Sequence, residues 1–380
     1  NTSIGVNGQV ATLNGDQEFP YLTSVNKVFY SVLPNVSVRY KIGMKKNLRL
    51  NYRASNNAPS VDQLQEVINN SNLQQITIGN QKLDQDFQHN LTLRYFSVDM
   101  EKSSNKFFLI NATYTRNYIT SLTQIANNSP LNVLIGDTGS YQLNRGSQLS
   151  QAINMDGYCS IRLFGTYGRP FFKGKINMNM NGGLNFTQTP SMIKVGLDEA
   201  KANYARNPSG SFGLVLGTNL SKVDLTLMST TTINFVSNTL QRSMDQNYVN
   251  QNSQIRITIN PTNKWVVSTD ITHQLFSGLT STLNQSYYLL NIGLGKKFGK
   301  NNQSELRFTV YDLFNQNRAI TRNITQSYFE DVRTKVLTRY AMITYTYTLK
   351  QLGAKSDDKD KKMMMFPGGM PMPGGMPHGG

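Results

Sequence analysis

Apolar and polar side chains alternate with a period of two residues in many segments of this chain. In Val36–Ile42 and in Asn47–Arg53, every second residue is Val, Leu, Ile or Tyr, and the residues between them are Ser, Asn, Arg or Lys. Successive side chains on a β-strand point to opposite faces, so each segment has one apolar and one charged face. Such a sheet fits half of a soluble β-sandwich, or a barrel that spans a lipid bilayer around a watery lumen.

The composition excludes membrane-spanning helices but is compatible with a membrane barrel. The chain has 380 residues, a mean hydropathy of −0.41 and no run of 18 apolar residues. A helical span needs about 20 mostly apolar residues, whereas alternation in barrel strands averages the hydropathy away. The 19 Tyr and 18 Phe, against one Trp, suit membrane interfaces, where a ring lies in apolar surroundings.

The lengths of the connections favour the membrane barrel over the sandwich. The alternating segments come in pairs joined by short polar turns, and much longer connections rich in Asn, Gln, Ser and Thr separate the pairs. Outer-membrane barrels have short periplasmic turns and long outer loops, and a soluble sandwich has no reason to sort its loops in this way. The long connections are predicted at Asn14–Asn35, Ser55–His89, Tyr118–Ser150, Thr187–Gly210, Ser237–Tyr248 and Asn315–Thr334, and Ser277–Leu283 is the one shorter connection between pairs.

The alternation predicts fourteen strands, from Ile4–Leu13 to Lys335–Leu349. We therefore predict an all-β fold for residues 1–350, a transmembrane antiparallel up-and-down β-barrel of a Gram-negative outer membrane with both ends on one side. The chain opens inside a strand without an initiator Met or signal peptide, so we expect the C-terminal part of a larger barrel. Residues 351–380, a charged run followed by Met, Pro and Gly, are expected to form a disordered periplasmic tail.

Basic side chains in the polar phase of the strands are the candidates for function. The net charge of +16 is spread over many strands rather than clustered, so we expect no nucleic-acid partner. Either these residues pair with Asp, Glu or a plug domain, which is the simpler interpretation, or they form an anion-attracting pore wall. The predicted lumen-facing residues are Arg39, Lys41, Arg49, Arg53, Arg94, Arg162, Arg256 and Arg307.

Tyrosines in the apolar phase are predicted to anchor the barrel at the membrane interfaces. Only tyrosines in the long loops, such as Tyr118, Tyr141 and Tyr204, are placed to stack on a ligand. The run Phe107–Ile110 breaks the alternation, and Leu109 is expected to contact something inside. The predicted interface residues are Tyr40, Tyr52, Tyr95, Tyr114, Tyr167, Tyr288, Tyr345 and Tyr347.

The sequence contains no catalytic or metal-binding constellation. His89, His273 and His378 are far apart and show no metal-ligand spacing, and neither G-x-S-x-G nor a phosphate-binding glycine loop is present. We therefore expect no enzymatic activity, no cofactor and no metal. The six Met of the tail would suit Cu(I), but Pro and Gly in the same stretch favour a flexible tail. The single Cys159 has no partner for an internal disulfide, and we expect it to be inert packing.

Leu33–Tyr95 carries an ordered series of short motifs. They are Tyr52-Arg53, Asn57-Ala58-Pro59-Ser60, Leu64-Gln65, Gly79-Asn80-Gln81-Lys82-Leu83 and the strand Asn90–Tyr95. This series resembles the barrel of TonB-dependent receptors of Bacteroidota, in the family of outer membrane β-barrel proteins. Val310–Gln316 and the ending Tyr345–Lys350 also resemble that family, so the likeness covers Leu33 to Lys350.

The resemblance implies a large plugged barrel that imports a ligand with energy from an inner-membrane partner. The sequence shows neither a plug nor a TonB-box peptide, so TonB would be contacted through a missing N-terminal region. The partners that the resemblance implies are the outer-membrane bilayer, TonB and an imported ligand that the sequence does not identify. Two alternatives stay open: a passive or structural barrel, such as a porin or adhesion component, and a soluble β-rich binding protein.

Overall fold

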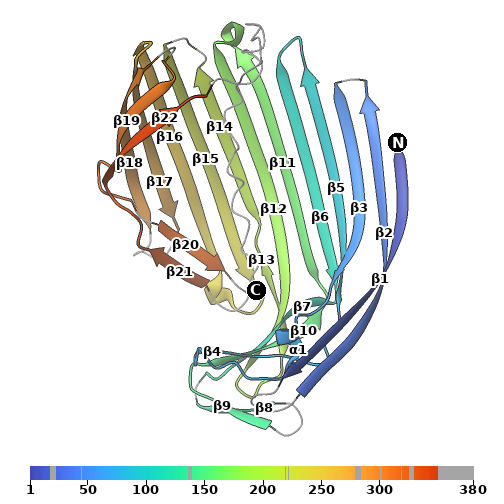
Figure 1. Ribbon diagram of the computed structural model, residues 1–380. Coiled ribbons are helices and arrows are strands. Elements are labelled where there is room, and N and C mark those ends of the chain that lie inside the picture. Colours follow the sequence, from blue (N-terminus) through green and yellow to red (C-terminus); the bar gives the residue numbers. More distant parts are fainter. Residues whose placement is uncertain are drawn as a thin grey trace.

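The computed structural model describes residues 1–17, 23–43, 45–127, 129–135, 139–218, 220, 222–278, 284–299, 302–317, 319–324 and 329–349. Within these ranges, fourteen strands lie side by side in one curved antiparallel wall (Figure 1). In spatial order they are β1 (Thr2–Gln17), β2 (Thr23–Ile42), β3 (Lys46–Asn57), β5 (Asp86–Asp99), β6 (Ser104–Arg116), β11 (Tyr158–Phe171), β12 (Ile176–Val195), β14 (Ser209–Thr218), β15 (Val223–Asn238), β16 (Gln246–Thr262), β17 (Trp265–Ser277), β18 (Gln285–Phe298), β19 (Ser304–Tyr311) and β22 (Tyr340–Tyr347).

The wall confirms the predicted fold class, and its strands correspond one for one to the fourteen alternating segments. Among the described strands, β1 pairs with β2 alone and β22 pairs with β19 alone, so the two borders of the wall are not joined to each other. None of the described helices has the length and apolar content that crossing a membrane requires.

The predicted loop Asn14–Asn35 is wrong, because most of it is strand. The pairing of β1 with β2 runs without interruption from Thr2 opposite Val38 to Gln17 opposite Thr23. In this part of β2, Phe29 is buried on one face while Val28 on the other face is also apolar. With apolar residues on both faces, the two-residue alternation disappears from the sequence although the strand continues.

The wall has an apolar face and a polar face. Large hydrophobic side chains stand exposed on the apolar face along the whole wall, for example Ile4, Val10, Ile255 and Phe308, which are 41% to 76% exposed. Cross-strand neighbours keep the same phase, as where Leu294 of β18 lies opposite Phe308 of β19. A belt of exposed apolar side chains is the surface that outer-membrane barrels turn toward lipid, which leaves the polar face for the lumen.

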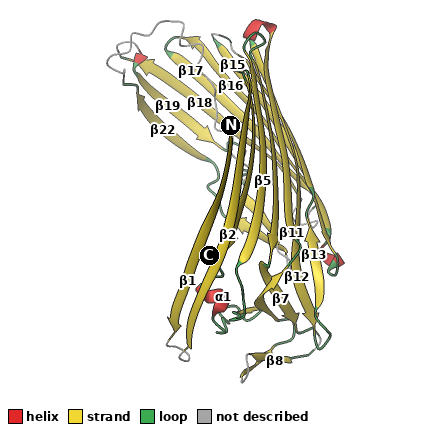
Figure 2. Ribbon diagram, turned by 90° about the vertical axis from the view of Figure 1, so that its right-hand side faces the viewer, coloured by secondary structure: helices red, strands yellow, loops and turns green. Residues whose placement is uncertain are grey.

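The turns that join the predicted strand pairs lie at one end of the wall, and the opposite end carries the folded long connections together with the short connections from β1 to β2 and from β17 to β18 (Figure 2). The predicted loops Ser55–His89, Tyr118–Ser150 and Thr187–Gly210 thus contain regular structure. The elements at this end are α1 (Val61–Leu64), β4 (Gln75–Ile78), β7 (Tyr118–Ile125), β8 (Leu131–Ile135), β9 (Gly139–Leu143), β10 (Gln148–Met155), β13 (Lys201–Arg206), the 3-10 turn η2 (Arg242–Met244), β20 (Ala319–Ile324) and β21 (Phe329–Thr334), while η1 (Phe172–Gly174) forms a short turn at the opposite end.

Residues 58–85 and 118–155 form a packed unit that we call the cap. In it, β10 pairs with β7 antiparallel and with β4 in parallel, and β7 also pairs in parallel with the end of β12. Apolar side chains fill its interior, including Ile76, Leu143 and Leu149. Burial of this apolar surface stabilises the cap although much of its sequence is Asn, Gln and Ser.

The cap rests on the polar face of β1 and β2. Val25 of β2 packs with Leu64 and Leu83 of the cap, and Lys27 Nζ donates to the Leu83 carbonyl oxygen over 2.6 Å. Val25 and Lys27 are odd-numbered residues of β2, as are Arg39 and Lys41 nearer the short turns. Alternate residues of a strand point to the same face. The cap and the candidate basic residues therefore lie on one face of the wall.

Candidate functional site

The eight predicted lumen-facing basic residues all lie on the polar face of the wall. The register carries this phase from strand to strand: Arg39 of β2 lies directly opposite Arg49 of β3, and Arg49 lies opposite Arg94 of β5. We call these three residues the arginine row. Charged groups of one sign on directly opposite positions destabilise a sheet, so the row calls for a physical explanation.

Two of the eight basic residues are neutralised by neighbouring carboxylates. Arg256 Nε lies 2.9 Å from an oxygen of Asp270 on the adjacent strand, and Arg307 Nη2 lies 2.6 Å from Glu305 on its own strand. For these two arginines, the simpler interpretation of pairing within the wall holds. Both lie in the part of the wall formed by β16 to β19.

The other six basic residues have no ion pair within the described part of the chain. All six side chains are exposed on the polar face. Two of them contact neutral groups: Arg49 Nε donates to the Asn51 amide oxygen over 3.1 Å, and the Arg162 guanidinium lies 6.0 Å from the Phe164 ring centroid. We call this set the basic sector: Arg39, Lys41, Arg49, Arg53, Arg94 and Arg162.

The strands that carry the basic sector supply it with no free carboxylate. β2, β3, β6 and β11 contain neither Asp nor Glu, and β5 contains only Asp86 and Asp99. Asp86 accepts hydrogen bonds from the backbone and side-chain amide of Asn57 near the cap. Asp99 accepts from the backbone N–H groups of Glu101 and Lys102 in a short turn. The sector thus differs from the region of Arg256 in lacking an internal counter-ion.

An apolar patch continues the arginine row on the same face. Leu109 of β6 lies opposite Arg94, and Phe164 of β11 lies opposite Leu109. Two residues nearer the short turns, Phe96 lies opposite Phe107, and the Phe107 ring meets the Phe164 ring edge to face at 6.4 Å. The structure thus explains the broken alternation at Phe107–Ile110, because Phe107 and Leu109 face the polar side while Phe108 and Ile110 face the apolar side.

The predicted interface tyrosines lie on the apolar face. Tyr40, Tyr95, Tyr167, Tyr345 and Tyr347 stand toward the short turns, and Tyr52, Tyr114 and Tyr288 stand toward the cap end. Sequence reasoning missed the cations beside the aromatic rings at the short-turn end. Lys106 Nζ lies 5.7 Å from the ring centre of Tyr167, and Lys296 Nζ lies 5.3 Å from that of Trp265. The cross-strand register, which the sequence does not display, creates these pairs.

Both described histidines belong to the aromatic belt of the apolar face. The Tyr52 hydroxyl and His89 Nδ1 are 2.8 Å apart, and the His273 ring stacks on Tyr288 at 4.5 Å. Among the described residues, no three His, Cys, Asp or Glu side chains come together as metal ligands. Cys159 is a half-buried free thiol in β11. His378 and the Met-rich tail lie outside the described residues.

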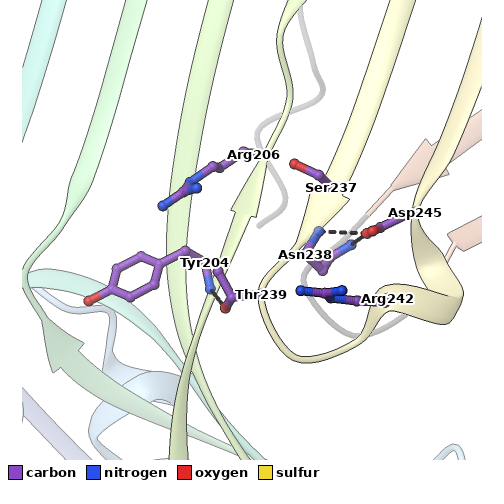
Figure 3. Close-up of a pocket in the computed structure, with 7 residues that line it drawn as sticks. All are labelled: Tyr204, Arg206, Ser237, Asn238, Thr239, Arg242 and Asp245. Atoms are coloured by element: carbon purple, nitrogen blue, oxygen red, sulfur yellow. Dashed lines mark hydrogen bonds between the residues drawn. The ribbon is translucent and has the colours of Figure 1, made fainter.

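A small hollow of about 270 Å³ opens at the cap end of the wall, beside β13 (Figure 3). Two hydrogen bonds tie its rim together: the Tyr204 backbone N–H donates to Thr239 Oγ1 over 2.9 Å, and the Asn238 N–H donates to Asp245 over 2.6 Å. Tyr204, which the sequence offered for ligand stacking, lines this hollow. It is lined by Tyr204, Arg206, Ser237, Asn238, Thr239, Arg242 and Asp245.

The two other loop tyrosines are packed within the cap. Tyr118 stacks on Tyr158 with ring centres 4.4 Å apart, and burial raises the pKa of its hydroxyl. Tyr141 packs against the apolar interior of the cap. Their rings therefore contribute to the fold of the cap.

Three of the five motifs in Leu33–Tyr95 build the first part of the cap, while Tyr52-Arg53 and Asn90–Tyr95 lie in β3 and β5. Ser60 caps the N-terminus of α1, its hydroxyl accepting from the Gln63 N–H while the Gln63 side chain accepts from the Ser60 N–H. Leu64 and Leu83 are buried, and the Gly79 N–H donates to the Gln65 carbonyl oxygen over 3.0 Å. The spacing of these motifs is therefore a requirement of the cap fold.

The sequence from residue 2 to residue 347 matches the model of the outer membrane protein β-barrel family. The chain belongs to this family. Membership, together with the exposed apolar belt, places the protein in the outer membrane with lipid around its apolar face. Among curated proteins, no sequence matches the chain.

Solved structures of similar shape include three outer-membrane proteins. A FadL homologue of Pseudomonas aeruginosa is 9% identical, with 90% of this chain and 86% of that chain covered and a TM-score of 0.34. OmpT of Vibrio cholerae in its trimer form is 10% identical, with 91% and 99% covered and a TM-score of 0.32. The toluene transporter TodX of P. putida is 9% identical, with 92% and 89% covered and a TM-score of 0.26. The family assignment rests on the sequence match over residues 2–347.

Proposed function

We propose that this barrel forms the wall of an outer-membrane receptor that takes up a ligand, and that it has no catalytic role. The observation that carries the proposal is the polar face, which is covered by a folded cap at one end and carries an exposed basic sector without carboxylate partners. A wall that only closed a structural barrel would have no need of six unpaired cations on strands that supply them with no free carboxylate. The positive charge of such a surface would raise the local concentration of anionic solutes.

The finer proposal is a receptor of the TonB-dependent kind from a member of the Bacteroidota. The ordered motifs of Leu33–Tyr95 support it, because they resemble the barrel of such receptors, and they lie in β3, in the cap and in β5. Energy coupling would require a plug domain and a TonB-box peptide, as the resemblance to such receptors implies. These parts would belong to an N-terminal region of the parent protein.

The second candidate function is passive diffusion through a porin-like barrel. The water-accessible polar face supports it, since a wet lumen by itself allows small solutes to pass. The two candidates differ in whether the passage is closed at rest and in whether the protein binds an energy-coupling partner.

Two measurements on the purified parent protein separate these functions. The first is swelling of proteoliposomes in arabinose, which reports open passage. The second is binding to the purified periplasmic domain of TonB from the same organism, followed by calorimetry. An energised receptor shows TonB binding and no swelling. Swelling without TonB binding establishes the passive barrel, and the absence of both contradicts uptake of either kind.

A further inference from the structure

We propose that the arginine row and the neighbouring apolar patch form one binding site for an amphipathic organic anion. The acidic group of the ligand would lie on Arg39, Arg49 and Arg94, and its ring or chain would lie on Phe107, Leu109 and Phe164. This inference deepens the proposed uptake function and rests on it, because it names the chemical class that the polar face would recognise.

The arginine row is arranged to receive an oxyanion. Neighbouring strands are about 4.8 Å apart, so the row spans about 10 Å across β2, β3 and β5. Each guanidinium offers a planar fork of donors that matches carboxylate, sulfonate or phosphate oxygens. Arg39 and Arg94 show no hydrogen bond from their guanidinium groups to the described chain, and Arg49 gives one to Asn51. An anion bound between adjacent arginines would remove the repulsion that their register imposes.

The apolar patch adds the second part of the specificity. Leu109 and Phe164 follow Arg94 in the same cross-strand row, so the site passes from guanidinium to hydrocarbon within about 10 Å. Phe96 beside them is 48% exposed, on a face where neutral polar residues are the rule. An exposed apolar patch on a face that meets water, rimmed by polar residues, is a mark of a ligand-binding surface. An inorganic anion would leave this patch unused, which favours an anion with an apolar body.

The contrast with Arg256 shows that the row is not an ordinary feature of this wall. At Arg256, the wall itself supplies the counter-ion, because Asp270 lies directly opposite Arg256 and pairs with it. At the equivalent position opposite Arg94, the chain places Leu109. Replacing Leu109 by Glu would therefore supply the missing counter-ion from within the wall.

The test is calorimetric binding of 2-naphthalenesulfonate to the full chain held in a non-ionic amphipol. Sulfate and neutral 2-naphthalenemethanol serve as the anion-only and ring-only probes. The naphthalenesulfonate is expected to bind at least about tenfold more tightly than either, because it uses both halves of the site. Binding of sulfate with equal affinity would overturn the apolar half of the proposal. Equal binding of the neutral alcohol would overturn the anionic half.

Three variants locate the site. Arg49→Gln with Arg94→Gln is expected to weaken naphthalenesulfonate binding about tenfold or more, and Phe107→Ala with Phe164→Ala several-fold. Leu109→Glu is expected to abolish binding while the fold is retained, because the new carboxylate pairs with Arg94. The matched control, Arg256→Gln with Asp270→Asn, also removes an arginine from the polar face but is expected to bind as the unmodified protein does.

Unchanged binding in the folded arginine or Leu109→Glu variants overturns the proposal, and so does an equal loss in the control. Retention of the heat-modifiable shift on unboiled gels shows that each variant is folded. Because this binding requires neither TonB nor passage, its failure and the failure of the uptake function are separate outcomes.

Discussion

At the scale of single residues, Gly79 is the position where the cap leaves no room for a side chain. A Cβ atom there would lie 2.1 Å from the carbonyl oxygen of Gln65 and 2.8 Å from that of Asp62. The close approach exists because the Gly79 N–H donates to the same Gln65 oxygen. Carbonyl oxygens belong to the backbone, so they can only make room if α1 moves.

Gly79→Ala is therefore expected to destabilise the cap by roughly 2 kcal/mol or more, in the range of strongly disruptive single substitutions. Gly8→Ala in β1 is the matched control, because a Cβ atom there meets nothing within 4 Å. The measurement is the rate of proteolysis within residues 58–85 at increasing urea concentration. Equal rates in both variants would contradict the steric argument.

At the scale of elements, the cap holds to the wall through a small apolar cluster. Leu64 at the end of α1 is completely buried and packs with Val25 of β2 and Leu83. This cluster joins a four-residue helix, which has little stability of its own, to the long β1–β2 hairpin. The position of the cap over the polar face thus depends on a few apolar side chains.

Leu64→Ala is expected to cost about 2–5 kcal/mol, as for other fully buried leucines, and to release the cap from the wall. Leu73→Ala is the control, since Leu73 is 59% exposed in the same segment. Hydrogen exchange of residues 58–85 measures the release. If the buried and the exposed leucine variants exchanged alike, the cluster would not be what holds the cap.

The wall strands were predictable because each has one apolar and one polar face. The strands of the cap were not predictable from the sequence. In β16, Ile255, Ile257 and Ile259 alternate with polar residues, and the strand follows directly from that pattern. The short cap strands are rich in polar residues and pair with distant segments, as β10 does with β4, and no local pattern encodes such pairing. The phase of Arg39, Arg49 and Arg94 could be read from the sequence, but the cross-strand register that places them opposite one another could not.

At the scale of the whole molecule, the two faces of the wall meet different solvents. A cation on the apolar face at mid-membrane costs roughly 2–4 kcal/mol, while one on the lumen side is hydrated. Ile255 stands exposed on the apolar face of β16, and Thr258 lies three residues away on the polar face. Placing Lys at each of these two positions therefore tests which face of the wall contacts lipid and which contacts water.

Ile255→Lys is expected to reduce the amount of folded barrel in the outer membrane severalfold, and Thr258→Lys to leave it nearly unchanged. Membrane fractionation followed by gel migration of unboiled and boiled samples measures both. Equal assembly of the two variants would contradict lipid contact at Ile255.

The two ends of the wall are expected to face opposite sides of the membrane. Arg145 is exposed in the cap, and Lys102 is exposed in a short turn at the other end. With Cys159 replaced by Ser, Arg145→Cys is expected to react with a membrane-impermeant maleimide on intact cells. Lys102→Cys is expected to react only after the outer membrane is permeabilised. The reverse pattern would invert the orientation of the barrel.

The strictly antiparallel order of the wall strands has a consequence for how such a wall changes in size. β16 and β17 form one hairpin, so their joint removal would bring β15 beside β18, still antiparallel and still with its apolar side outward. Removal of a single strand would place two parallel neighbours edge to edge and demand a crossover of a dozen or more residues. The circumference of the protein can therefore grow or shrink in whole hairpins, and a receptor for a larger cargo is reachable by duplication of two strands at a time.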